Sequence, residues 1–95
     1  MNEIQKYISK NESKMLEDLF SLIRIPSISA KPEHHDDMLA CAERWAQLLI
    51  EAGADEALVM PSKGNPIVFG QKTVDPTAKT VLIYAHYDVM PAEPL

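Results

Sequence analysis

The stretch Val81-Leu82-Ile83-Tyr84-Ala85-His86-Tyr87-Asp88 carries most of the structural information in this chain. Its first five residues are all apolar, which is typical of a strand buried on both faces, and we expect that strand to span residues 79–86. Such a strand needs covering layers above and below it. Residues two apart in an extended segment point to the same side. The sequence therefore predicts a polar pair, His86 and Asp88, at the end of an interior strand, a plausible beginning for a metal site.

Two further strands are expected before this one, at residues 56–60 and 66–71. The turn-forming residues Ser62-Lys63-Gly64-Asn65 separate them, and Asp75-Pro76-Thr77 forms the turn before the third strand. Only seven residues connect the second and third strands, which is too few for a helical crossover. We therefore expect that pair to be antiparallel.

The first half of the chain is helical in pattern. Residues 3–24 carry an apolar stripe at three- and four-residue spacings, and Asn11 could cap a second helix if the polar stretch 9–13 breaks the first. Pro26 ends this region. A second helix is expected over residues 36–52.

The end of that second helix is marked by Gly53, which is placed to adopt a left-handed conformation. Taken together, the elements predict an α/β fold. We expect a mixed sheet of three strands covered by two to three helices in a three-layer arrangement.

Composition excludes several classes of partner. The chain has 95 residues, enough for one domain, and a formal net charge of -5, so it offers no basic surface for nucleic acid or for an anionic membrane. No apolar run is long enough to span a bilayer, and the N-terminus lacks a signal-peptide pattern. The single cysteine, Cys41, cannot form an internal disulfide, which favours a reducing compartment and a cytoplasmic location.

Several segments together resemble the M20 zinc peptidases, in particular the dipeptidase branch that includes carnosinase-like enzymes. The segment 86–91 resembles the first metal-binding motif of that family, and Met90 stands where the dipeptidase branch often has glutamine. The other segments that carry the resemblance are Leu22-Ile23-Arg24-Ile25-Pro26-Ser27-Ile28-Ser29, Leu49-Ile50-Glu51-Ala52-Gly53 and Pro91-Ala92-Glu93-Pro94-Leu95. The resemblance covers nearly all of the chain but only the beginning of a full family member.

The resemblance implies a role for each residue of the pair. His86 would be a zinc ligand, and Asp88 would be the active-site carboxylate that orients its ring. Residues 1–95 would be the N-terminal portion of a metallopeptidase catalytic domain, without the lid or dimerisation domain. The complete enzyme would hydrolyse dipeptides or acyl-amino acid amides with two zinc ions, whereas this chain alone would bind no zinc and be inactive.

Other residues that could bind a metal or act in catalysis are explained more simply by structural roles. His34-His35-Asp36-Asp37 is interpreted as a solvated loop running into a helix N-terminus, where the aspartates favour the helix dipole. Cys41 lies on the apolar face of the second helix and is interpreted as a buried structural thiol. Trp45 shares that face and is expected to be a core residue.

Two alternative functions remain open at this point. The chain could be a small non-catalytic α+β module that self-associates, because a strand apolar on both faces with only two covering helices leaves an exposed apolar surface. It could also belong to a different zinc amidohydrolase with a similar opening architecture.

Overall fold

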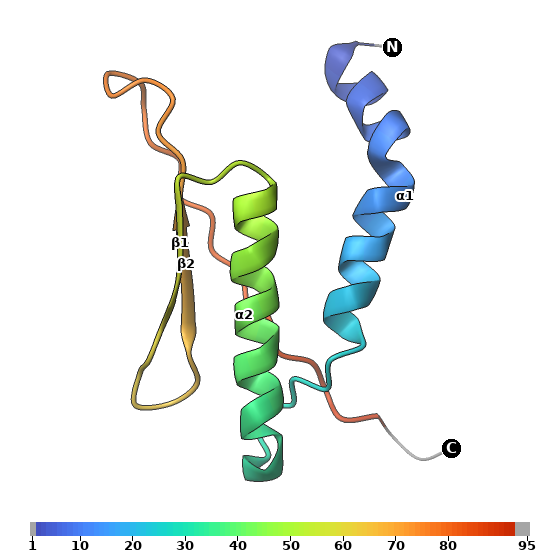
Figure 1. Ribbon diagram of the computed structural model, residues 1–95, viewed down its shortest axis with the longest axis vertical. Helices are drawn as coiled ribbons and strands as arrows, with labels where there is room; N and C mark the ends of the chain where they lie inside the picture. Colours follow the sequence, from blue (N-terminus) through green and yellow to red (C-terminus); the bar gives the residue numbers. More distant parts are fainter. Residues whose placement is uncertain (1, 93–95) are drawn as a thin grey trace.

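Two helices followed by a two-stranded sheet make up the regular structure of this chain (Figure 1). The structure is a computed structural model that describes residues 2–92. In chain order its elements are α1 (Glu3–Ile23), the 3₁₀ turn η1 (Pro32–His34), α2 (His35–Glu51), β1 (Glu56–Met60) and β2 (Ile67–Gln71). The predicted α/β class is confirmed. Neither helix within residues 2–92 has the length and apolar character needed to cross a membrane.

Helix α1 is one continuous helix that begins at a capping box. The Asn2 side chain accepts a hydrogen bond from the Gln5 backbone amide at 2.8 Å, and the Gln5 side chain accepts one from the Asn2 amide at 3.0 Å. The proposed break at residues 9–13 is wrong. Asn11 does not cap a helix; its amide donates to the Tyr7 carbonyl one turn earlier, so the polar stretch stays within the helix on its exposed side.

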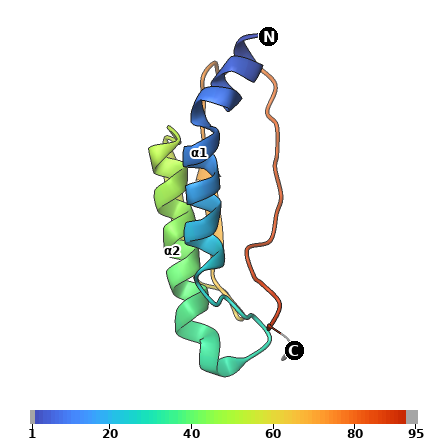
Figure 2. The same cartoon turned by 90° about the vertical axis from the view of Figure 1, so that its right-hand side faces the viewer.

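Helix α2 lies between α1 and the sheet (Figure 1) and runs antiparallel to α1 (Figures 1 and 2). Arg44 joins the two helices, since its Nε donates to Ser21 Oγ at 3.0 Å and its Nη2 lies 3.8 Å from Asp18 Oδ1. The helix ends before Gly53, whose φ of 105° is a left-handed conformation, as predicted.

The buried core is small and centred on α2. Its members are Leu22, Ser27, Met38, Cys41 and Ala42. Most of the apolar stripe of α1 remains partly exposed because α2 covers only part of that helix.

The sheet is an antiparallel pair whose inner face packs on α2. Val59 pairs with Val68, and both are half-buried. A Cβ on Gly70 would lie only 2.9 Å from Leu49 Cδ1, so the absence of a side chain lets strand and helix approach closely. The outer face carries the pair Leu58 and Phe69, which are both exposed.

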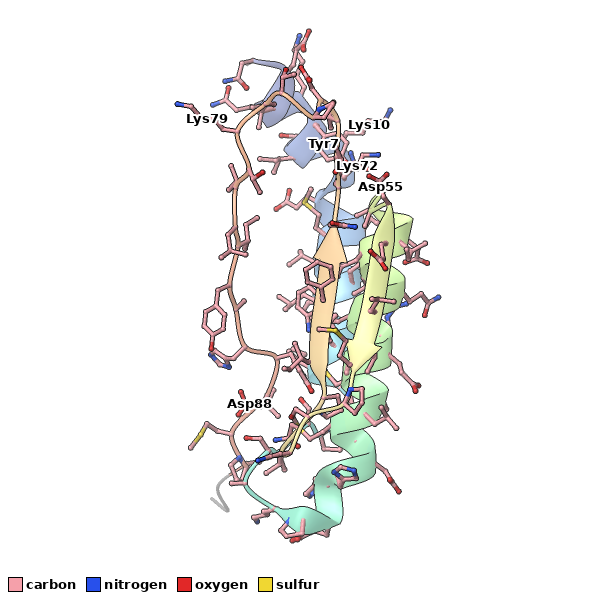
Figure 3. The ribbon with its side chains drawn as sticks, turned by 90° about the vertical axis from the view of Figure 1, so that its left-hand side faces the viewer. Tyr7, Lys10, Asp55, Lys72, Lys79 and Asp88 are labelled. Atoms are coloured by element: carbon pink, nitrogen blue, oxygen red, sulfur yellow. The ribbon has the colours of Figure 1, made fainter. Side chains whose placement is uncertain are left out.

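The predicted third strand does not form in the part of the chain that the structure describes. Residues 79–86 are extended but form no strand, and residues 81–84 are between 81% and 90% exposed. The segment runs down the molecule opposite in direction to β2 but apart from it (Figure 3). A strand needs a partner about 4.8 Å away to complete its hydrogen bonds. The expected antiparallel pairing of the second and third strands is therefore wrong, and the pairing occurs between β1 and β2 instead.

Because the core is small, each of its large side chains should matter for stability. Met38 is 3% exposed, and replacing it with alanine is expected to lower the free energy of unfolding by about 2–5 kcal/mol, since the cavity cannot fully collapse. Urea unfolding followed by the fluorescence of Trp45 measures this change. The matched control is Met15→Ala at a position 42% exposed on α1, which should shift stability by about 0.5 kcal/mol or less.

Candidate metal-binding site

His86 and Asp88 meet at the end of the extended segment. Figure 3 shows Asp88 at the opposite end of this segment from Lys79. His86 Nδ1 lies 2.7 Å from Asp88 Oδ1, as the two-residue spacing suggested. The His86 side chain is 81% exposed, so this contact is what holds a ring otherwise surrounded by solvent. The other ring nitrogen, Nε2, makes no hydrogen bond to any of residues 2–92.

The second oxygen of Asp88 is also engaged. Ser29 Oγ donates to Asp88 Oδ2 at 2.5 Å, across 59 residues of sequence. The Ser29 hydroxyl, followed by the His86 contact, holds the pKa of the Asp88 carboxyl below its ordinary value. The carboxylate is therefore ionised at neutral pH and can only accept hydrogen bonds, which requires His86 Nδ1 to carry the proton.

Tyr87, between the two site residues, points the other way and anchors the segment. Its hydroxyl donates to the Pro66 carbonyl at 2.6 Å, and its side chain is partly buried. Burial, followed by the nearby Cys41 and Asp88, raises the pKa of the Tyr87 phenol. The phenol therefore stays protonated and keeps its hydrogen bond over the physiological pH range.

Cys41 is a buried thiol, as expected. It is 1% exposed, and its Sγ contacts the Tyr87 carbonyl at 3.8 Å. Burial raises the pKa of the Cys41 thiol, and the hydrogen bond with Ser27 only partly offsets that effect. The residue stays protonated at neutral pH and is not an activated nucleophile.

The acidic and histidine cluster at the start of α2 does not form a ligand set. His34 Nδ1 contacts Asp37 Oδ2 at 2.8 Å, while His35 and Asp36 are exposed. Within residues 2–92, no three histidine, cysteine or acidic side chains come together as a metal site would require. His35 and Asp36 are solvated at the start of α2, whereas His34 and Asp37 are half-buried and contact each other.

A hollow of ≈ 160 Å³ adjoins the His86 and Asp88 pair. Its apolar wall includes Leu19 and Ile23 from α1 and Trp45 from α2. Trp45 is thus half-buried at the edge of the core rather than in its centre. Because it is the chain's single tryptophan, its fluorescence reports on this region.

Ser27 and Ser29 are site residues that were not predicted from the sequence. Both follow Pro26 and lie about 60 residues before the segment they contact. Serines in a loop are common, and no local spacing connects them to His86. The only signal in the sequence was that this turn belonged to the family resemblance.

The donor set fits one position of a metal site. A neutral imidazole whose Nδ1–H is held by a carboxylate offers the lone pair of Nε2, and this is the usual arrangement around a metal-bound histidine. Further ligands are needed to hold a catalytic metal, and residues 2–92 do not bring them together. Residues 93–95, which contribute to the resemblance to dipeptidases, lie outside the described residues.

Comparison with known proteins gives a consistent but partial result. No family model matches the chain, and no solved structure matches it. Among curated proteins, it is 29% identical over 105 residues to a Cys-Gly metallodipeptidase of Schizosaccharomyces pombe, covering 97% of this chain and 21% of the relative. It is 32% identical over 101 residues to a Cys-Gly metallodipeptidase of Candida albicans, covering 90% of this chain and 20% of the relative.

A bacterial protein adds a third match. The chain is 30% identical over 86 residues to a cysteinylglycine-S-conjugate dipeptidase of Corynebacterium striatum, covering 90% of this chain and 19% of the relative. The chain thus spans about a fifth of the length of the curated relatives it matches. It is similar, over nearly all of its own length, to proteins named as dipeptidases.

Proposed function

We propose that this chain supplies part of the active site of an M20-type, zinc-dependent dipeptidase. His86 is one zinc ligand and Asp88 is the carboxylate that orients it. The observation that carries the proposal is the 2.7 Å contact between His86 Nδ1 and Asp88 Oδ1, which leaves Nε2 facing solvent. The similarity to metallodipeptidases supports it from a separate direction.

The roles of the two residues follow from their geometry. Asp88 accepts the Nδ1 proton of His86, fixes the ring orientation and increases the basicity of Nε2. The chemistry that a pair of zinc ions supplies when bound is polarisation of a peptide carbonyl and activation of water.

The proposed substrates are small peptides, and dipeptides ending in glycine are the first to test. The names of the relatives include Cys-Gly and cysteinylglycine S-conjugates as their substrates. We extend that substrate class to the protein in which this chain acts. The acidic net charge gives no support for nucleic acid as a partner.

We also propose that the 95-residue chain alone has no peptidase activity and holds no zinc ion stably. A catalytic zinc site uses about three protein ligands, and residues 2–92 bring no three candidate ligands together. The relatives that support the function are about five times longer than this chain, so most of their residues have no counterpart in it.

A hybrid enzyme tests this function directly. Residues 1–95 replace the matched segment of the Schizosaccharomyces pombe Cys-Gly metallodipeptidase, and the hybrid is assayed for zinc content and for hydrolysis of cysteinylglycine. We expect the hybrid to hydrolyse the dipeptide, to lose activity with a chelator and to regain it with zinc, while the 95-residue chain stays inactive. A folded hybrid that binds no zinc would contradict the proposal.

A second candidate function is association with another copy of this chain. The observation that favours it is the exposure of Val81, Leu82, Ile83 and Tyr84, each more than four-fifths exposed. Four consecutive apolar side chains in an extended segment form a ready site for strand pairing. We propose that the isolated chain self-associates through this segment, which is compatible with the catalytic proposal for a longer protein.

A further inference from the structure

The Asp88 carboxylate is held at both of its oxygens, and only one of the two partners is His86. Oδ1 faces His86 Nδ1 at 2.7 Å, and Oδ2 accepts a hydrogen bond from Ser29 Oγ at 2.5 Å. The Ser29 hydroxyl therefore contacts the carboxylate that orients His86 and makes no hydrogen bond to His86 itself.

Ser27 fixes the backbone on both sides of Asp88. Its carbonyl accepts a hydrogen bond from the Val89 amide at 2.9 Å, and its hydroxyl donates to the Tyr87 carbonyl at 3.1 Å. Ser27 is fully buried, so these two hydrogen bonds are shielded from water. They bring the turn after Pro26 alongside residues 87–89 and place Ser29 opposite Asp88.

The Ser29 hydrogen bond restricts rotation of the Asp88 carboxylate, which the contact with His86 alone does not prevent. A carboxylate can rotate about its last side-chain bond, whose energy minima are broad. One contact, to an imidazole that is itself exposed, leaves both groups able to move together. A second hydrogen bond to the other oxygen fixes the carboxylate plane, and the ring that donates to Oδ1 is then fixed as well.

We propose that Ser29 is a positioning residue, whose hydroxyl holds the Asp88 carboxylate so that His86 keeps its proton on Nδ1 and presents Nε2 outward. The proposal depends on the proposed function in one respect only, which is that the ligand of His86 Nε2 is a zinc ion. The hydrogen-bonded chain from Ser29 through Asp88 to His86 involves only residues of the polypeptide and is tested in the polypeptide alone.

The test compares Ser29→Thr with Ser29→Val, because threonine and valine have nearly the same shape and differ in the hydroxyl. The 95-residue chain is labelled with ¹⁵N-histidine and ¹⁵N-valine, and the tautomer of His86 is read by NMR at about pH 8, where histidine is normally neutral. We expect the wild type and Ser29→Thr to carry the proton mainly on Nδ1. In Ser29→Val, we expect the share of the Nε2–H form to rise by at least about two-fold.

Two other variants calibrate the measurement. Ser13→Val, at an exposed position on α1, should leave the His86 tautomer unchanged. Asp88→Asn should abolish the preference for Nδ1–H through the direct contact. The Val89 amide signal and Trp45 emission show whether each variant keeps the local fold.

Either of two results would overturn the role of Ser29. If Ser29→Thr and Ser29→Val shift the tautomer equally, the position matters for shape and not for its hydroxyl. If neither shifts it, Asp88 alone orients His86. In the hybrid enzyme, Ser29→Val should weaken zinc affinity by about 10-fold while Ser29→Thr does not. A hybrid that binds no zinc would refute the proposed function and leave the tautomer result standing.

Discussion

Replacing His86 with alanine in the hybrid enzyme is expected to reduce cysteinylglycine hydrolysis by more than about 100-fold and to lower its zinc content. Changing a residue that only orients a metal-bound histidine typically costs about 10–100-fold, and loss of the ligand itself should cost more. The measurement is kcat/KM together with bound zinc per protein, determined at saturating and at limiting zinc.

Two matched variants make this result specific. Asp88→Asn keeps the shape of the side chain but removes the charge that accepts the Nδ1 proton, and we expect a loss of about 10–100-fold. His35→Ala removes an exposed imidazole at the start of α2 and should leave activity unchanged. If the hybrid is active and His86→Ala retains that activity, His86 is not a zinc ligand.

The parts of the fold that were predictable from the sequence depend on neighbours along the chain. The spacing of apolar residues predicted both helices, and Gly53 marked the end of α2. The bounds of β1 agreed with the prediction, and β2 began one residue later than expected. Each of these features is decided within a few residues, where periodicity and turn chemistry act.

The prediction of a third strand was wrong because strand formation depends on contacts with distant parts of the chain. Residues 79–86 have the composition of a buried strand, but a strand also needs a partner for its backbone hydrogen bonds and cover for its side chains. The described part of the chain supplies neither. Periodicity cannot show whether the partner is present.

In the candidate site, too, the local contact was predictable from the sequence and the contacts between distant segments were not. The His86 and Asp88 contact follows from a two-residue spacing and was predicted from it. The contacts of Ser27 and Ser29 with residues 87–89 join segments about 60 residues apart. Only the three-dimensional arrangement brings that turn beside the site, so the second hydrogen bond to Asp88 had no counterpart in the sequence pattern.

The isolated chain is expected to self-associate, and changing both Leu82 and Ile83 to lysine should weaken that association by more than about 100-fold, equivalent to about 2.7 kcal/mol. Consecutive residues of an extended segment point to opposite sides, so the two lysines place a charge on each face. Burial of an unpaired charge is unfavourable, which opposes packing of either face against a second copy.

The surface area of the chain supports the same expectation. Its accessible surface is 7985 Å², whereas a compact monomer of this mass exposes roughly 5,500 Å². The excess, about 2,500 Å², is as large as the area that many stable interfaces bury. The radius of gyration of 15.8 Å also exceeds the roughly 12–13 Å of a compact domain of this length.

Sedimentation velocity over a range of concentrations measures the effect, and Val74 provides the matched control. Val74 is 87% exposed and lies outside the apolar segment, so Val74→Lys adds charge without interrupting residues 81–84. We expect Val74→Lys to associate like the wild type and the double lysine variant to sediment as a monomer. A wild-type chain that remains monomeric at high concentration would show that exposed apolar residues alone do not drive pairing. Equal weakening by Val74→Lys would contradict a specific role for residues 81–84, because a lysine lowers the magnitude of the net charge of -5 and so cannot oppose association through overall repulsion.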